Sequence, residues 1–257
     1  MATYVLIPGA ASGPWYWHLL VDELTGRGHD VVPVDLPCED DSAGLAEYAD
    51  AVVEAVEGRS GLILVAHSLG GFTAPLVCER VPVDLLVMLQ AMVPAPGESP
   101  GEWWTSTGHD QARREQDERD RRAPDDDTLL FYADTPPALV AEAARHPRGQ
   151  SGTPMLKPWP LPAWPDVPTR FLLARDDRFF PAEFLRRLVR ERLGIVPDEM
   201  PGDHMPMLGH PKELADRLEA YRAEIIEGRR PGACPPSGGN RGSAAPPAPP
   251  SDASRGR

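Results

Sequence analysis

The segment with the sharpest chemical signal is AHSLGG at residues 66–71, between an apolar run at residues 61–67 and a helical pattern at residues 70–81. A serine on a tight strand-to-helix turn holds its hydroxyl above the sheet edge, and small residues on either side let the two backbones approach. The positive N-terminal end of the following helix favours negative charge that develops nearby. The segment therefore predicts Ser68 as a nucleophile, with a serine that only caps the helix as the simpler alternative.

A serine hydroxyl is a weak nucleophile, so it needs a general base and an acid that orients the base. Asp176 and Asp177 directly follow a predicted strand at residues 169–174, and such strand ends lie at the same sheet edge as the serine turn. His204 follows in the turn GDHMP, after a weak strand pattern. The order serine, acid, histidine predicts a catalytic triad, with Asp176 and Asp177 as alternative acids.

Among the seven histidines, only His204 lies in a Gly- and Pro-bounded loop after an acid-bearing strand end. His67 adjoins the serine, and we expect its side chain to point away from that of Ser68 and to pack or cap. We expect structural roles for the other five, which lie in helices, at loop edges or in a predicted cap: His18, His29, His109, His146 and His210.

The elements that must position these residues follow from the apolar pattern. Apolar runs predict strands at residues 3–8, 30–35, 61–67, 84–90, 169–174 and 196–201. Amphipathic patterns predict helices at residues 15–28, 43–58, 70–81, 181–194 and 210–228. Continuous apolar strands separated by helices are typical of an α/β fold whose mostly parallel sheet has helices on both faces.

The alternation of strands and helices breaks from Val93 to about Val167, where Pro, Trp and charged residues are frequent and the patterns predict only short helices. A long segment of this kind inside a compact domain usually has a function. We therefore expect an α/β core made of residues 1–92 and 168–227, and a helical cap or lid at residues 93–167, inserted after the strand that ends near Gln90.

Four segments together resemble the α/β-hydrolases: PGA near residue 9, AHSLGG, ARDDRFFPAEF at 174–184, and GDHMPML followed by HPKELA. The closest group is the small esterases that include plant methyl esterases and hydroxynitrile lyases, and the resemblance runs from about residue 3 to residue 227. It implies a serine hydrolase with Ser68 as nucleophile, His204 as base and Asp177 as acid, Asp176 being the rival. It also implies an oxyanion hole made by the backbone N–H groups of Ala10 and Leu69.

Four positions depart from the patterns of this group or choose among its reactions. Pro8 stands where the family usually has histidine, and Ala66 takes the first small position of the serine turn. Hydroxynitrile lyases of the group have threonine and lysine at the positions of Gly9 and Met205, so this chain lacks the cation that would stabilise a cyanide leaving group. The resemblance thus favours hydrolysis of a small to medium apolar carboxylic ester through an acyl-enzyme.

Two other readings stay open. The same triad could act on an amide, a thioester, a lactone or a C–C bond, or as a lyase, and the chain could be a non-catalytic ligand-binding protein. Aromatic residues near the oxyanion loop and in the cap are expected either to line an apolar pocket or to form the cap core: Trp15, Trp17, Trp103, Trp104, Phe131, Tyr132 and Trp159.

The composition indicates which classes of binding partner to expect. The net charge of −13 argues against nucleic acid and anionic membranes, because both need a basic face. We expect a small-molecule substrate and no membrane partner, with a homodimer left open. No cofactor motif occurs, and we expect no metal, since the acidic run at residues 125–127 reads as a solvated helix start.

Three scattered cysteines, Cys38, Cys78 and Cys234, predict no disulfide framework. The N-terminus lacks a basic region and a long apolar run, so we expect a cytoplasmic protein without a signal peptide. Residues 228–257 hold seven prolines and six glycines and almost no large apolar side chain, so we expect a disordered tail.

Overall fold

The structure is a computed structural model, which describes residues 1–121 and 127–228. The predicted disordered tail lies outside the described residues except for Gly228, and so do Cys234 and the first two residues of the acidic run at 125–127.

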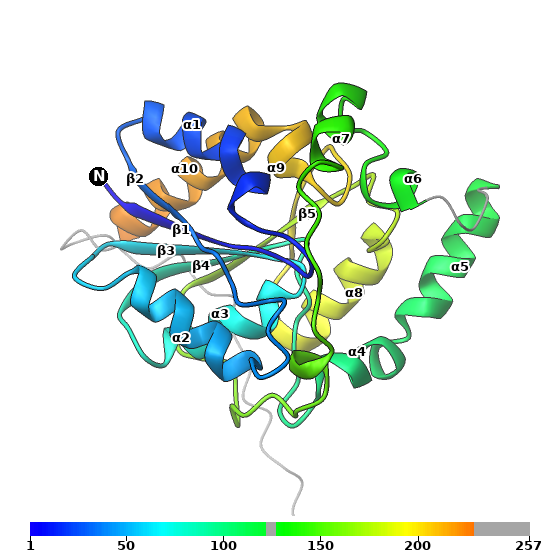
Figure 1. Cartoon of the computed structure of the whole chain (residues 1–257), viewed down its shortest axis with the longest axis horizontal. Coiled ribbons are helices and arrows are strands. Elements are labelled where there is room, and N and C mark those ends of the chain that lie inside the picture. Colours follow the sequence, from blue (N-terminus) through cyan, green and yellow to red (C-terminus); the bar gives the residue numbers. More distant parts are fainter. Residues whose placement is uncertain (122–126, 229–257) are drawn as a thin grey trace, which may run out of the picture.

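The centre of the molecule is a six-stranded parallel sheet with strand order β2-β1-β3-β4-β5-β6 (Figure 1). The chain moves outward from β1 to β2 and then returns past β1 to β3, so neighbouring loops after β1 and β3 leave the same sheet edge. Such a reversal of strand order is where α/β sheets usually bind ligands. The strands are β1 (Thr3–Ile7), β2 (Asp30–Pro33), β3 (Leu62–His67), β4 (Val83–Leu89), β5 (Thr169–Ala174) and β6 (Asp198–Met200).

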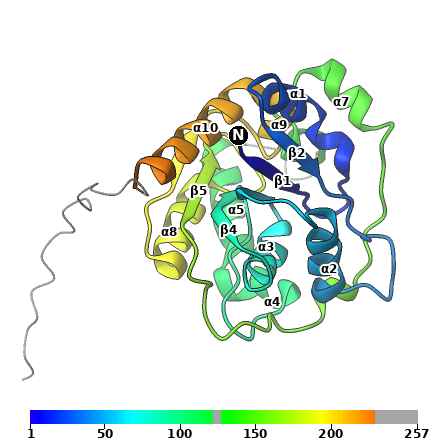
Figure 2. The same ribbon diagram turned by 90° about the vertical axis from the view of Figure 1, so that its left-hand side faces the viewer.

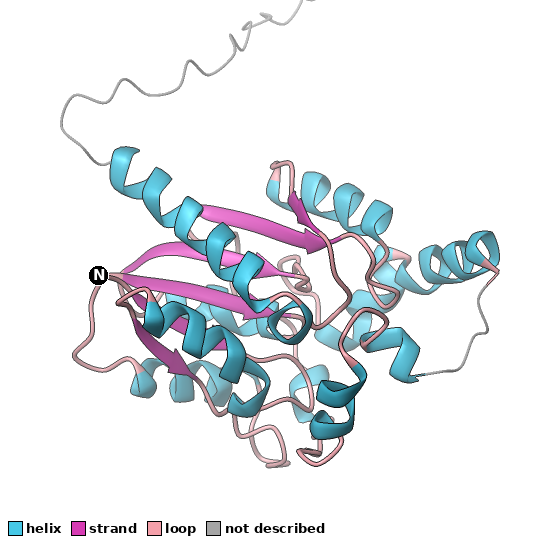
Figure 3. Ribbon diagram, turned by 90° about the horizontal axis from the view of Figure 1, so that it is seen from above, coloured by secondary structure: helices cyan, strands magenta, loops and turns pink. Residues whose placement is uncertain are grey.

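Successive strand side chains enter two different cores, as the two-residue repeat of a strand requires. In β1, Val5 and Ile7 pack with the helices on one face, while Tyr4 and Leu6 pack with those on the other. Figure 3, seen from above, shows helices packed on both sides of the layer of strands. One face is covered by α2 (Leu45–Ala55), α3 (Gly70–Cys78) and α8 (Ala182–Leu193). The other is covered by α1 (His18–Gly26), α9 (Pro206–Gly209) and α10 (Pro211–Gly228).

Residues 93–167 leave the sheet after β4 and form only short helices. The segment runs past the sheet edge from the side of α3, where α4 lies, to the side of α1, where α7 lies (Figure 2). The buried Trp159 indole attaches it to the core by donating to the Phe72 carbonyl at 3.1 Å, and the buried Trp103 indole donates to the Val93 carbonyl, at the start of the segment, at 3.0 Å. Its described elements are α4 (Pro100–Thr107), α5 (His109–Asp120), α6 (Asp127–Phe131), α7 (Pro137–Ala143) and the 3-10 turn η2 (Thr153–Met155).

The predicted fold class is confirmed, and the differences lie at element ends. The helix expected at residues 15–28 is split into the 3-10 turn η1 (Pro14–Trp17) and α1. The helix expected at residues 70–81 ends at Cys78, because proline at 82 disfavours helical backbone just before it. The strand expected through Gln90 ends one residue earlier, since Gln90 has a φ of 45°. None of the described helices combines the length and apolarity needed to cross a membrane.

Gly71 offers a test of the packing beside the serine turn. A Cβ at Gly71 would lie 2.0 Å from the Met92 carbonyl oxygen, so the β4 loop would have to move. We expect Gly71→Ala to lower the free energy of unfolding by about 3 kcal/mol, measured by urea denaturation. Gly26→Ala is the control, because a Cβ there has nothing within 4 Å, and it should be neutral or slightly stabilising. Equal losses in the two variants would contradict this picture.

Candidate active site

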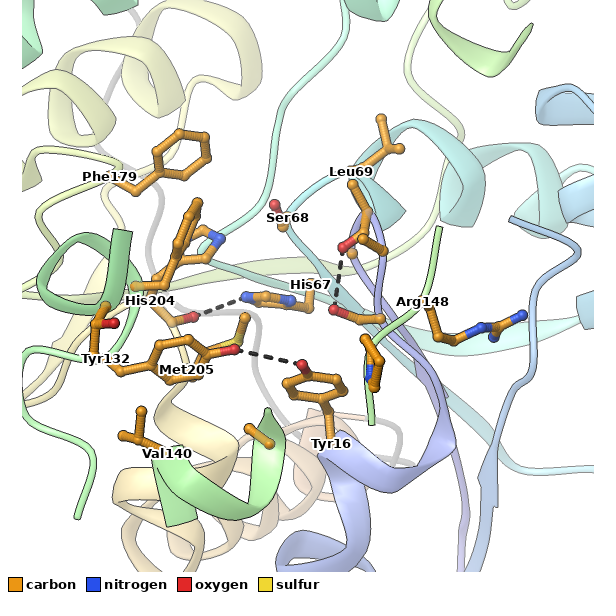
Figure 4. A pocket seen from close by; sticks show the side chains of 18 of the residues that line it. Tyr16, His67, Ser68, Leu69, Tyr132, Val140, Arg148, Phe179, His204 and Met205 are labelled. Atoms are coloured by element: carbon orange, nitrogen blue, oxygen red, sulfur yellow. Dashed lines mark hydrogen bonds between the residues drawn. The ribbon is translucent and has the colours of Figure 1, made fainter. Parts of the chain in front are cut away.

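A cavity of about 530 Å³ opens at the carboxyl edge of the sheet, beneath the segment 93–167. Ser68 and His204 lie in its wall, and most of the other lining side chains are apolar (Figure 4). Its volume is in the range of small-molecule sites. The chain thus places Ser68 and His204, its predicted nucleophile and base, in the wall of one largely apolar cavity.

Ser68 sits between β3 and α3 with a φ of 51°, a left-handed conformation that non-glycine residues rarely adopt. Its carbonyl accepts hydrogen bonds from the amides of Gly71 at 3.1 Å and Met92 at 3.0 Å, which hold the strained turn in place. A Cβ at Gly70 would lie 2.9 Å from the Pro8 carbonyl oxygen. This close approach explains why the turn needs small residues after the serine.

His204 is joined to Asp177 by a hydrogen bond of 2.8 Å between Nδ1 and Oδ2, and both side chains are buried. Oδ1 of Asp177 accepts from the amides of Phe179 at 2.7 Å and Phe180 at 3.1 Å. The rival acid, Asp176, is exposed, and its carboxylate accepts from the Gly202 amide at 3.2 Å. The structure therefore brings Asp177, and not Asp176, to His204.

Gln90 is a member of this group that the sequence analysis did not single out. Its side chain is fully buried, and Nε2 donates to Oδ2 of Asp177 at 2.5 Å, the same oxygen that contacts His204. The positive φ of Gln90 turns the chain out of β4, and the Met92 amide then donates to the Ser68 carbonyl. In the sequence, the only indication of a role for Gln90 is that a polar residue stands at the end of an otherwise apolar strand.

The two amides expected to form an oxyanion hole, those of Ala10 and Leu69, belong to residues that line the cavity. Within the described residues, neither amide donates to another protein group. The next amide, that of Ala11, is taken by the Gln150 side chain at 3.0 Å, and Ser12 Oγ donates to the Ala10 carbonyl at 3.1 Å. These bonds fix the loop and leave two backbone donors beside Ser68.

His67 supports the loop that carries His204. Because a carbonyl oxygen can only accept, Nε2 of His67 donates to the His204 backbone oxygen, at 2.8 Å. Complete burial, and secondarily the nearby His204 ring, lower the pKa of His67 well below its usual value. The expected capping or packing role fits this bond, although the residue also borders the cavity.

The aromatic residues divide between the two expected roles. Trp104, Phe131 and Tyr132 line the cavity, whereas Trp17, Trp103 and Trp159 are fully buried. Trp15 stacks on His146 with ring centroids 4.4 Å apart. Two further aromatic residues, Tyr16 and Phe179, also line the cavity. No sequence pattern indicated this, because their positions depend on how their loops turn.

Comparison with known proteins agrees with this geometry. Residues 4–217 match the "Alpha/beta hydrolase family". A rice protein named "Probable esterase PIR7A" is 30% identical over 253 residues, covering 84% of this chain and 94% of its own length. "Methyl jasmonate esterase 1" of Vitis vinifera is 25% identical, with 87% of this chain and 96% of the relative covered. The crystal structure of polyneuridine aldehyde esterase has a TM-score of 0.69 at 21% identity, covering 86% and 99% of the two chains.

The chain belongs to the α/β-hydrolase family, and the resemblance to plant esterases is confirmed. It is an esterase-like enzyme of that family. In the part of the chain that the structure describes, no three His, Cys, Asp or Glu side chains gather to hold a metal ion.

A substitution at Gly9 tests how much space there is beside Ser68. A Cβ at Gly9 would lie 2.8 Å from the Cβ of Ser68 and 3.4 Å from its Oγ. We expect Gly9→Ala to lower kcat/KM for an ester about 100-fold, since displacement of reacting groups by about 1 Å has effects of that size. Gly152→Ala, at a site with nothing within 4 Å, is the control. Unchanged kinetics in Gly9→Ala would show that the loop yields easily.

His67 predicts a pH effect on stability. Its pKa is near 6.5 in the unfolded chain and far lower in the folded chain, so below about pH 6.5 only the unfolded chain takes up the proton. This group therefore removes stability as pH falls, by up to about 1.4 kcal/mol per pH unit. His67→Gln, which keeps a side-chain donor, should show a shallower loss of unfolding free energy between pH 7.5 and 5.5. Parallel curves for the two proteins would refute the assignment.

Proposed function

We propose that the chain hydrolyses carboxylic esters through an acyl-enzyme, with Ser68 as nucleophile, His204 as general base and Asp177 as the acid that orients the base. The observation that carries the proposal is the buried Asp177–His204 hydrogen bond beside a strained serine in an apolar cavity. Because Nδ1 of His204 is engaged with Asp177, its Nε2 is the nitrogen left for the serine proton.

In the first half of the reaction, Ser68 Oγ attacks the ester carbonyl carbon while its proton moves to His204 Nε2. The amides of Ala10 and Leu69 donate to the resulting oxyanion, and one such donor is worth about 3–4 kcal/mol. The negative charge of Asp177 stabilises the imidazolium. Collapse of the intermediate expels the alcohol, which takes the proton from His204.

In the second half, a water molecule gives a proton to His204 and attacks the acyl carbon on Ser68. The second oxyanion forms at the same two amides. When it collapses, the bond to Ser68 Oγ breaks, the serine regains its proton from His204, and the carboxylic acid leaves. Every proton lost in one step is thus returned in another, so no cofactor is needed.

The cavity supports a small or medium uncharged ester. Its walls are mainly apolar, and Arg148, the one cation among the described residues that line it, is paired with Asp35 and lies 3.6 Å from Glu39. The residue after the base is Met205 and so brings no charge. The esterase names of the two plant relatives support the same bond type.

The test is labelling by a fluorophosphonate probe together with a p-nitrophenyl ester chain-length series. We expect wild type to label and to hydrolyse short or medium esters. Ser68→Ala should abolish labelling, and Ser68→Ala or His204→Ala should each lower kcat by about 10⁴–10⁶-fold. Ser60→Ala, an exposed serine, is the matched control and should behave as wild type.

The possible failures differ in meaning. Full esterase activity in Ser68→Ala would overturn the mechanism. Labelling at Ser68 without turnover of any ester would overturn the bond type and direct the search to amides, thioesters, lactones or C–C bonds. Absence of labelling in folded wild-type protein would favour a ligand-binding role.

A further inference from the structure

The cavity contains a second polar feature that the proposed reaction does not use, a pair of tyrosine hydroxyls. Tyr16 comes from η1 and Tyr132 directly follows α6, and their hydroxyl oxygens lie 3.4 Å apart. In Figure 4 the pair lies across the cavity from Ser68 and Leu69. One tyrosine thus belongs to the core and the other to the segment 93–167.

Four other polar side chains of the lining are already engaged or exposed. Ser12 donates to the Ala10 carbonyl and His67 to the His204 carbonyl. Arg148 is held by Asp35 and the Leu36 carbonyl, and Thr128 is exposed to solvent. The tyrosine pair is therefore the part of the lining best placed to bind a polar group of a ligand away from Ser68.

The hydrogen bond within the pair is weak. An O–H···O bond is usually 2.7–2.8 Å long, so a separation of 3.4 Å is close to the limit. Within the described residues neither hydroxyl has another hydrogen-bond partner. When one hydroxyl donates to the other, the second proton is still free to donate to a ligand.

The Tyr132 hydroxyl keeps its proton at neutral pH. Burial, and then the neighbouring Tyr16 hydroxyl and the carboxylate of Asp203, raise the pKa of Tyr132. Tyr16 is only 8% exposed, so its ring is held by packing. Phenolic O–H donors suit a ligand oxygen that carries no proton, such as a carbonyl oxygen.

We propose that Tyr16 and Tyr132 together bind a second acceptor oxygen of the substrate, so that the preferred substrate is an uncharged ester with an oxo group several bonds from the ester carbonyl. This inference rests on the proposed ester hydrolysis. An oxygen placed about 2.8 Å from both hydroxyls accepts a hydrogen bond from each in place of the weak bond within the pair, and it links the core to the segment 93–167. Apolar walls around both anchors disfavour a charged group in its place.

The test uses pairs of esters of equal chain length, with and without an oxo group two to four methylene groups from the ester, on the acyl or the alcohol side. We expect wild type to prefer at least one oxo ester over its plain partner by about tenfold or more in kcat/KM. In the double variant Tyr16→Phe/Tyr132→Phe this ratio should fall to within about twofold. Tyr221→Phe, a buried tyrosine of α10 outside the cavity, should keep the wild-type ratio. No preference in wild type for any oxo ester, or an unchanged ratio in the double variant, would overturn the proposal.

Binding separates this proposal from the esterase mechanism. Calorimetry on Ser68→Ala, with and without the two Tyr→Phe changes, measures the affinity for the same ester pairs without turnover. We expect the substitutions Tyr16→Phe and Tyr132→Phe together to weaken binding of the preferred oxo ester about tenfold and to change the affinity for the plain ester less. If wild type hydrolyses no ester, the esterase proposal fails, and the calorimetric comparison alone then tests whether Tyr16 and Tyr132 bind the oxo group. Equal affinities of the proteins with and without the two Tyr→Phe changes would refute that role.

Discussion

The site depends on the hydrogen bonds that the buried carboxylate of Asp177 accepts. A charge with no solvent contact is very costly unless hydrogen bonds satisfy it, and here four donors do so: the His204 ring, the Gln90 amide and the backbone amides of Phe179 and Phe180. These donors come from the loops after β4, β5 and β6. These hydrogen bonds to the Asp177 carboxylate therefore fix the ends of three strands relative to one another, and they also orient the His204 imidazole.

The serine turn depends on a second constraint, close backbone contact at the reversal of strand order. β1 and β3 are neighbours, with Ile7 beside Ala66, so the loop after β1 and the serine turn leave the sheet together. Gly9 and Gly70 have no room for a side chain, and the β4 loop holds the Ser68 carbonyl through the Met92 amide. The strain of a positive φ at Ser68 is thus sustained by its surroundings, as such strain must be.

The segment 93–167 and the loop of His204 are built as one unit. Asp203 is buried next to His204 in the chain, and its carboxylate accepts from the Asp134 amide and the Thr135 hydroxyl, both at 2.8 Å, as well as from the Met205 amide. On the other side, His109 Nε2 bonds to the Phe179 carbonyl at 2.7 Å, next to the amide that holds Asp177. The segment 93–167 therefore contacts the chain beside both His204 and Asp177.

The sequence by itself determined the fold class, because period-two and helical apolar patterns are local properties, and it pointed to Ser68 and His204, because their turns have distinctive neighbours. It left Asp176 and Asp177 as alternatives, since adjacent residues at a strand end differ only in which way the turn directs each side chain. Tertiary structure alone decided that Asp177 meets His204, that Gln90 joins them, and that Tyr16 meets Tyr132 across 116 positions. Contacts between distant loops depend on the packing of the whole sheet, and no short sequence pattern encodes them.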